Sequence, residues 1–120
     1  MRVVSVGEAL IDFSGEGELL FRGRPGGSPM NVAVACARLG VATGFLTQLS
    51  SDLFGTAIER HLLASGVDTS LLSKSDAPTA LAFVQQEGEE ARYDFRLAGS
   101  ADSLFDPRPR PRLPATARFL

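Results

Sequence analysis

The chain has 120 residues, of which 44% are hydrophobic and 22% are charged, a composition typical of one soluble globular domain. Its net charge of −2 gives no reason to expect a nucleic acid or an anionic membrane as a partner. The single cysteine, Cys36, excludes an intrachain disulfide, and no segment resembles a signal peptide or a membrane span, so we expect a cytoplasmic protein.

The chain opens with strand-like sequence. The valines at 3–6 end at Gly7 and predict a short buried strand. Residues 8–13 continue as extended or turning chain, and 15–19 form a turn-rich connection. A further short strand is predicted over 19–23.

A helix follows. Ser28 is a favourable N-cap, and Pro29 is suited to the first helical position. The helix is expected to run to about Leu39, with Gly40 just beyond its end.

The next segment repeats the order strand, helix. Residues 41–49 predict a strand, and either Ser51 or Asp52 can cap a helix over 53–65 that stops at Gly66. The alternation of strands and helices indicates an α/β fold with parallel pairing.

The last third changes character. Residues 79–86 and 91–98 predict a β-hairpin, followed by a helix favoured by the Ser-Ala-Asp-Ser run at 100–103. From Asp106 the chain is rich in proline and arginine, which is typical of a stiff extended connector rather than a basic partner site. Residues 119–120 predict the opening of another strand.

Two adjacent glycines precede the first predicted helix. Gly26 and Gly27 remove two Cβ atoms beside free helix N–H groups, which lets a ligand approach the backbone. The same pair also suits a tight turn that needs a positive φ. On spacing alone, both interpretations stay open.

Two polar residues flank this turn. Asn31, in the first turn of the helix, has an amide that both donates and accepts hydrogen bonds, as a sugar hydroxyl does. Asp12 follows an apolar run at a strand end, where ligands of open α/β sheets collect, and its carboxylate can accept from two neighbouring hydroxyls. Local helix support for Asn31 and a simple turn role for Asp12 are the alternatives.

Other chemical motifs are weak or missing. His61 lies in a helix without a triad-like partner, and Cys36 is expected to be a small core residue. No His, Cys or acidic residues have metal-ligand spacing, so no metal site is predicted. The run "GEGELL" lacks the third glycine of a dinucleotide fingerprint, and "GRPGGSPMN" lacks the Gly-Lys-Ser/Thr of a P-loop.

The ordered combination of motifs is more specific than its parts. "VGEALIDF", "GGSPMNVAVACARLG", "GFLTQLSSDLFG" and "PTALAFV" followed by "YDFR" and "GSADSL" occur in this order. Together they resemble the N-terminal part of a ribokinase-like (phosphofructokinase-B family) carbohydrate kinase, with bacterial fructokinases as the nearest group. The resemblance covers essentially all of residues 1–120.

The glycine-asparagine run is the most specific match to the family's first signature. The matching positions are Gly26, Gly27, Pro29, Asn31, Ala33 and Gly40. The last glycine of that signature falls at Ser50, which is a mild departure because fructokinase-like members tolerate an "LSxDxFG" form.

The resemblance implies an architecture and a set of contacts. The fold would be a doubly wound α/β sheet with a small β lid, to which strands near 19–23, 79–86 and 91–97 would belong. Binding of the sugar would involve Asp12, Gly26, Gly27, Asn31 and an aromatic-arginine pair at Phe95 and Arg96.

The resemblance also implies what these residues do not supply. The catalytic aspartate, the ATP pocket with its Mg²⁺ and a monovalent-cation site that some members use belong to the C-terminal half of the family. Since none of those motifs occurs in residues 1–120, we expect no catalytic residue here and no kinase activity of this chain alone.

Two function classes therefore remain. The first is the sugar-binding part of an ATP-dependent, fructokinase-like enzyme, with ribose, a nucleoside or 2-keto-3-deoxygluconate as alternative acceptors. The second is a non-catalytic sugar-binding or dimerisation module, because exposed lid strands leave edges through which a homodimer can form. The end of the chain at a strand's start, Phe119–Leu120, favours a truncated record of a longer protein.

Overall fold

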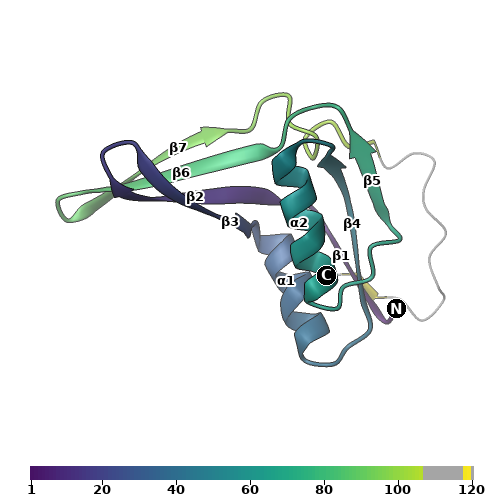
Figure 1. Ribbon diagram of the computed structural model, residues 1–120. Helices are drawn as coiled ribbons and strands as arrows, with labels where there is room; N and C mark the ends of the chain where they lie inside the picture. The colour runs from purple at the N-terminus through teal and green to yellow at the C-terminus, as the bar shows by residue number, and fades with distance from the viewer. Residues whose placement is uncertain (107–117, 120) are drawn as a thin grey trace.

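The computed structural model of the protein describes residues 1–106 and 118–119. Within them the chain forms two four-stranded sheets and two α-helices, β1-β2-β3-α1-β4-α2-β5-β6-β7-β8 in chain order. Figure 1 shows one sheet beside the helices and the other extending from them as an arm. We call these the inner sheet and the outer sheet.

The inner sheet has the strand order β5-β4-β1-β8, with every pair parallel. Its strands are β1 (Val3–Val6), β4 (Thr43–Ser50), β5 (Leu72–Ser75) and β8 (Arg118–Phe119). Parallel strands need crossovers, and the helices α1 (Ser28–Arg38) and α2 (Leu53–Ala64) lie in these connections.

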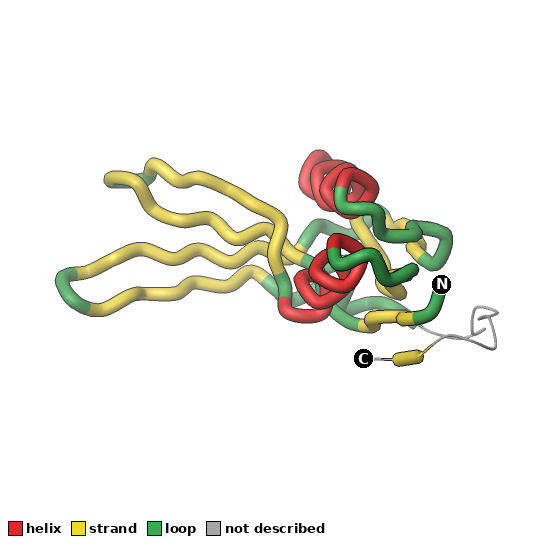
Figure 2. Tube along the Cα trace, turned by 90° about the horizontal axis from the view of Figure 1, so that it is seen from below, coloured by secondary structure: helices red, strands yellow, loops and turns green. Residues whose placement is uncertain are grey.

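The outer sheet has the order β3-β2-β6-β7. It consists of two antiparallel hairpins, β2 (Leu10–Gly17) with β3 (Leu20–Gly26) and β6 (Ala80–Glu87) with β7 (Glu90–Arg96). The hairpins join through a parallel pair, β2 with β6. Figure 2 shows them side by side, with both tips pointing away from the helices.

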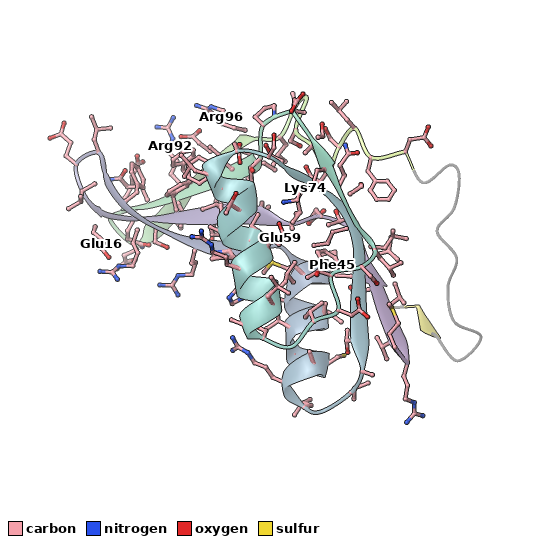
Figure 3. The ribbon with its side chains drawn as sticks, turned by 45° about the vertical axis from the view of Figure 1, so that its right-hand side comes forward. Glu16, Phe45, Glu59, Lys74, Arg92 and Arg96 are labelled. Carbon is pink, nitrogen blue, oxygen red and sulfur yellow. The ribbon has the colours of Figure 1, made fainter. Side chains whose placement is uncertain are left out.

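The core lies between the helices and one face of the inner sheet. Phe45 of β4 is completely buried, and its ring belongs to one apolar cluster with residues of both helices. The buried members from the strands and helices include Met30, Ala33, Val34, Phe45, Leu49, Ile58 and Leu62. Both described helices therefore cover the same face of the inner sheet, and Figure 3 labels Phe45 beside them.

The expected helix ends are confirmed. Gly40 and Gly66 follow the two helices at φ +88° and +84°, the left-handed region that glycine tolerates. Asp52 caps α2, because its Oδ1 accepts the Gly55 N–H at 2.8 Å.

The start of α1 differs from expectation. Gly27, at φ +104°, is the N-cap, and Ser28 is already helical and makes no side-chain capping bond. The Asn31 N–H donates to the Gly27 carbonyl at 2.9 Å, which closes the first turn one residue earlier than predicted.

Two other predictions are wrong. The run at 100–103 forms turns instead of a helix, because the Ser100 hydroxyl donates to Asp102 Oδ1 at 2.5 Å and competes with the helical pattern. Cys36 is half-buried and does not belong to the core.

Most of the other predicted strands are found, but β5 was not predicted, and β2 runs through 15–17, where a turn was expected. The strands expected near 19–23, 79–86 and 91–97 correspond to β3, β6 and β7, and the strand expected at 119 corresponds to β8. Most of the proline-rich connector lies outside the described residues. None of the described helices is long and apolar enough to cross a membrane.

Candidate functional site

The pairing register divides the outer sheet into two faces. Asp12 pairs with Arg24 of β3 and with Ala82 of β6, and Ala82 pairs with Phe95 of β7. Directly paired residues share a face, so these four side chains form one row across the sheet. We call this side the Asp12 face.

The opposite face packs on helix α2. It carries Phe13 and Phe83, whose rings stack at 5.0 Å between centroids, and Phe54 of α2 meets Phe13 edge-on at 5.7 Å. Because this face is held against α2, the Asp12 face is directed away from the helix.

The Asp12 carboxylate lies over Gly26. A Cβ added to Gly26 would collide with Oδ2 of Asp12, and Gly26 itself is buried. The glycine is therefore required for space: its missing side chain leaves the room that the carboxylate occupies. Gly26 is the last residue of β3, directly before the start of α1, so the Asp12 carboxylate that lies over it is also next to the start of α1.

Gly27 is required for its backbone conformation as well as for space. At φ +104° it turns the chain from β3 into α1, and an added Cβ would lie 2.9 Å from the Glu8 carbonyl oxygen. Asn31, one turn into α1, is exposed. The positive φ that the sequence left open is found at Gly27 and not at Gly26, and the approach of a ligand to this backbone stays a prediction.

A cavity of about 500 Å³ adjoins the Asp12 face. Its walls come from the end of β1, the start of β2, the middle of β4, and from β7 and the turns after it. The lining residues include Val6, Glu8, Leu10, Thr47, Phe95, Leu97, Ser100, Asp102 and Ser103. Leu10 and Phe95 belong to the Asp12 face, so the cavity lies at the base of that face.

The predicted aromatic-arginine pair is split between the two faces. Phe95 lines the cavity and stacks on Tyr93 at 6.1 Å between ring centroids. Arg96, the next residue, pairs with Leu81 and lies on the opposite face, where its Nη1 donates to the Phe95 carbonyl at 3.0 Å. Figure 3 shows Arg96 and Arg92 projecting from the same side of β7.

The structure thus places Asp12 against Gly26, the neighbour of Gly27, and Phe95 on the same face two strands away. Arg96 lies on the opposite face. A sugar contact from Arg96 stays a prediction. Sequence reasoning missed the polar residues Glu8, Ser100, Asp102 and Ser103, which line part of this largely apolar cavity. The "GSADSL" run contains three of these residues, but the sequence predicted a helix there and so indicated a structural role.

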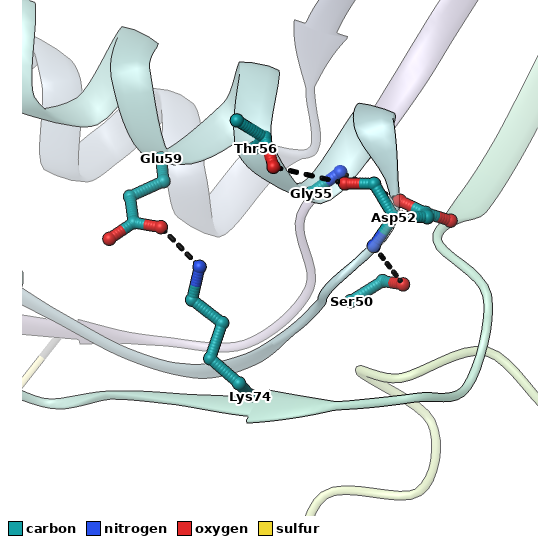
Figure 4. A network of polar contacts seen from close by, with 6 residues as sticks. All are labelled: Ser50, Asp52, Gly55, Thr56, Glu59 and Lys74. Atoms are coloured by element: carbon teal, nitrogen blue, oxygen red, sulfur yellow. Dashed lines mark hydrogen bonds and ion pairs between the residues drawn. The ribbon is translucent and has the colours of Figure 1, made fainter.

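A polar network joins α2 to the start of β6. Asp52 accepts from the Thr79 hydroxyl at 2.6 Å and from the Thr79 N–H at 3.0 Å, in addition to its bond from Gly55. Burial works against the charged form, but the hydrogen bonds from Thr79, Gly55 and Ser50 together lower the pKa of Asp52 below its ordinary value. Figure 4 shows the part of this network around the helix start.

No group of three or more His, Cys, Asp or Glu side chains within residues 1–106 and 118–119 could hold a metal ion. The geometry described above instead suits an uncharged polar ligand, since it combines a carboxylate, hydroxyls and an aromatic ring around open backbone.

Comparison with known proteins identifies the family of the chain. The model of the pfkB family carbohydrate kinases matches residues 1–114. The chain belongs to this family. A fructokinase from Escherichia coli is 34% identical over 88% of the chain and 35% of its own length. A 5-dehydro-2-deoxygluconokinase from Geobacillus kaustophilus is 37% identical over 68% of the chain and 27% of its own length.

Solved structures of the pfkB family give the same fold. A crystal structure of fructokinase with bound ATP from Xylella fastidiosa superposes with a TM-score of 0.81 at 38% identity, covering 87% of the chain and 36% of that protein. The ribokinase-like α/β fold is therefore confirmed. The chain spans about a third of the length of the relatives it matches.

Proposed function

We propose that this pfkB-family chain is the acceptor-binding part of an ATP-dependent carbohydrate kinase that phosphorylates a sugar hydroxyl, most similar to a fructokinase. One observation carries the proposal: the Asp12 carboxylate lies over Gly26 beside the start of α1, on the face that leads into the cavity under Phe95. The cytoplasm, where ATP is abundant, is the compartment that fits this reaction.

The chemistry of the residues matches a polyol acceptor. Ionised Asp12 accepts charge-assisted hydrogen bonds from two adjacent hydroxyls of one sugar. The exposed Asn31 amide both donates and accepts, and the Gly26–Gly27 backbone allows close approach. Phe95 supplies an apolar surface for the sugar's C–H groups.

The outer sheet is proposed to act as a lid. Its Asp12 face would close over the bound sugar, which excludes water and limits wasteful hydrolysis of ATP. Binding energy from the hydroxyls is thereby used to orient the reacting hydroxyl.

The described residues do not fit ATP or Mg²⁺ themselves. No phosphate loop occurs in the sequence, and the part of the chain that the structure describes has no acidic cluster for a metal. ATP, Mg²⁺ and any monovalent cation would be held by residues outside this chain, together with the catalytic base. The chain of 120 residues is accordingly proposed to bind sugar without phosphorylating it.

Substitution of Asp12 tests the assignment. In the complete polypeptide that the gene encodes, Asp12→Ala is expected to raise the KM for the sugar about 100-fold, because two charge-assisted hydrogen bonds are lost. Steady-state kinetics with fructose, ribose, a nucleoside and 2-keto-3-deoxygluconate measure this effect and identify the acceptor.

Asp94→Ala is the matched control. Asp94 lies in the same sheet on the opposite face, paired with Phe83, so its loss should leave the KM unchanged. An Asp12→Ala enzyme with wild-type KM for every acceptor would remove the assignment, and a wild-type polypeptide that phosphorylates no member of the panel would remove the proposed function.

A dimerisation role is the second candidate. The outer sheet ends in two edge strands, β3 and β7, and Tyr93, Phe95 and Leu97 are exposed at 59%, 53% and 44%. Such edges can pair with a second copy of the chain. Sedimentation of the chain tests this: a monomer across the micromolar range would exclude it.

A further inference from the structure

The outer sheet is attached to the rest of the molecule through four crossings of the chain, and these crossings differ. The β1–β2 and β3–α1 crossings contain Gly7 and Gly27, at φ +148° and +104°. The other two crossings lead into β6 and out of β7. Up to residue 106, where the continuous description of the chain ends, they contain no left-handed residue except Gly99, and side chains of the inner layer bond to them.

The crossing into β6 is held by Asp52. Thr79 directly precedes β6 and is only 7% exposed. Its hydroxyl and its N–H donate to the two carboxylate oxygens of Asp52, at 2.6 Å and 3.0 Å. Asp52 is itself fixed at the N-terminus of α2 by the Gly55 N–H, so this crossing is tied to a helix whose inner face, with Ile58 and Leu62, is buried in the core.

The crossing out of β7 is tied to the first. The Ala101 N–H donates to the Pro78 carbonyl at 2.8 Å, and the side chain of Gln48 of β4 donates to the Ala101 carbonyl at 2.9 Å. Both crossings of the β6–β7 hairpin are therefore bonded to each other and to the inner layer. We call the Asp52–Thr79 and Gln48–Ala101 bonds the anchor.

The anchor lies close in sequence to the row that forms the candidate site. Ala82, three residues after Thr79, stands between Asp12 and Phe95 in that row. Asp102, directly after Ala101, lines the cavity. A displacement of Thr79 would therefore move the row of Asp12 and Phe95 relative to the cavity wall on the inner sheet.

We infer that Asp52 and Thr79 are positioning residues for the acceptor site: they fix the β6–β7 side of the outer sheet, so that the sheet moves as a lid about this side. The β1–β2 and β3–α1 crossings, which contain glycine, then allow the β2–β3 hairpin to move with the rest of the sheet. This inference rests on the proposed function for its kinetic consequence, but the attachment itself can be measured without activity.

Thr79→Val tests the inference, because valine keeps the shape of threonine and removes the hydroxyl that bonds to Asp52. In the complete polypeptide it should raise the KM for the acceptor about tenfold and leave kcat and the KM for ATP within about twofold. Thr79→Ser, which keeps the hydroxyl, should restore the wild-type KM.

Thr56→Val is the matched control. Thr56 belongs to the same network, but its hydroxyl donates to the Asp52 backbone carbonyl at 3.2 Å rather than to a group of the outer sheet (Figure 4). Thr56→Val should change neither the acceptor KM nor kcat. If Thr79→Val does not fold, Asp52→Asn replaces it, since asparagine still caps α2 but presents an NH₂ group toward Thr79.

Hydrogen exchange measured by mass spectrometry provides the second readout. Loss of the anchor should speed exchange of the amides in 80–97 and leave those of β1, β4 and α1 unchanged. Unchanged exchange in 80–97, an equal increase in Thr56→Val, or an unchanged acceptor KM in an active enzyme would overturn the inference. If the wild type phosphorylates no acceptor, the proposed function fails, and the exchange data alone still decide whether the anchor exists.

Discussion

The inner layer and the outer sheet of this chain are stabilised in different ways. In the inner layer, Phe45, Ile58 and Leu62 are completely buried in one cluster between β4 and the helices. In the outer sheet, every residue of β7 is exposed, and the aromatic contacts are pairs such as Phe13–Phe83 and Tyr93–Phe95. Apolar burial therefore stabilises the first region, and cross-strand pairs stabilise the second.

This difference means that the residues that stabilise the chain and the proposed site residues lie in different regions. The inner layer buries enough apolar surface to hold its shape, so it can serve as a fixed base. The outer sheet leaves Asp12 half-buried and Phe95, on the same face, exposed. Segments with little burial open at low free-energy cost, which is what a closing lid requires. The following substitutions test the separation, beginning with the largest expected effect.

Phe45→Ala should have the largest effect on stability. It removes a completely buried ring from the core and is expected to lower the free energy of unfolding by about 3–5 kcal/mol. That is a large fraction of the total for a small domain, about 5–15 kcal/mol. Urea unfolding followed by circular dichroism at 222 nm measures the change.

Phe21→Ala is the counterpart in the outer sheet. The Phe21 ring is half-buried and meets Phe83 edge-on at 5.4 Å, so its loss should cost about 1 kcal/mol, much less than that of Phe45. Equal losses for the two variants would show that the two regions do not differ in the way described.

Gly26→Ala should reverse the pattern and affect binding more than stability. The added Cβ would collide with Oδ2 of Asp12, and that carboxylate is the far end of a side chain that can rotate away. Little stability is then lost, but the carboxylate leaves its position. The acceptor KM of the complete polypeptide should rise about tenfold, as expected for one impaired charge-assisted hydrogen bond.

Gly17→Ala is the control for Gly26→Ala, at the other end of the same hairpin. Its added Cβ would meet only the Leu20 Cβ, at an ordinary 3.8 Å. Both kinetic constants should remain those of the wild type. A Gly26→Ala enzyme that binds its acceptor normally would show that the position of Asp12 over Gly26 is irrelevant to binding.

Local signals in the sequence were sufficient to predict where helices begin and end. Gly40, Gly66 and Asp52 act where a left-handed residue or an N-cap is needed, and such requirements depend on the nearest neighbours alone. The strand β5 was not predicted. Two of its four residues are exposed, and it exists because Leu72 and its neighbours pair with β4.

Contacts between strands, and between α2 and β6, could not be predicted from the sequence. Phe95 and Arg96 are adjacent, but successive residues of a strand point to opposite faces, and the side that faces Asp12 depends on the register of three strand pairs. The second role of Asp52 is similar. Its bond to Thr79 spans 27 positions, so the sequence indicated a helix cap and gave no signal of the contact to β6.

The smallest expected effect is a dependence of stability on pH through Asp52, the residue that links the two regions. The hydrogen bonds from Thr79 and Gly55 lower the pKa of Asp52 in the folded state, so the unfolded chain binds more protons in the acid range. The stabilisation is complete above the unfolded pKa of about 4 and is lost as the pH falls through the folded pKa.

Urea unfolding of the wild type and Asp52→Asn between pH 7 and pH 3 measures this loss of stability. The variant should lose less stability on acidification than the wild type. Asp68, whose pKa is also lowered, by hydrogen bonds from Ser70, contributes equally to both proteins and does not obscure the difference. Parallel loss in both would mean that the Asp52 carboxylate does not hold the outer sheet to α2 through its charge.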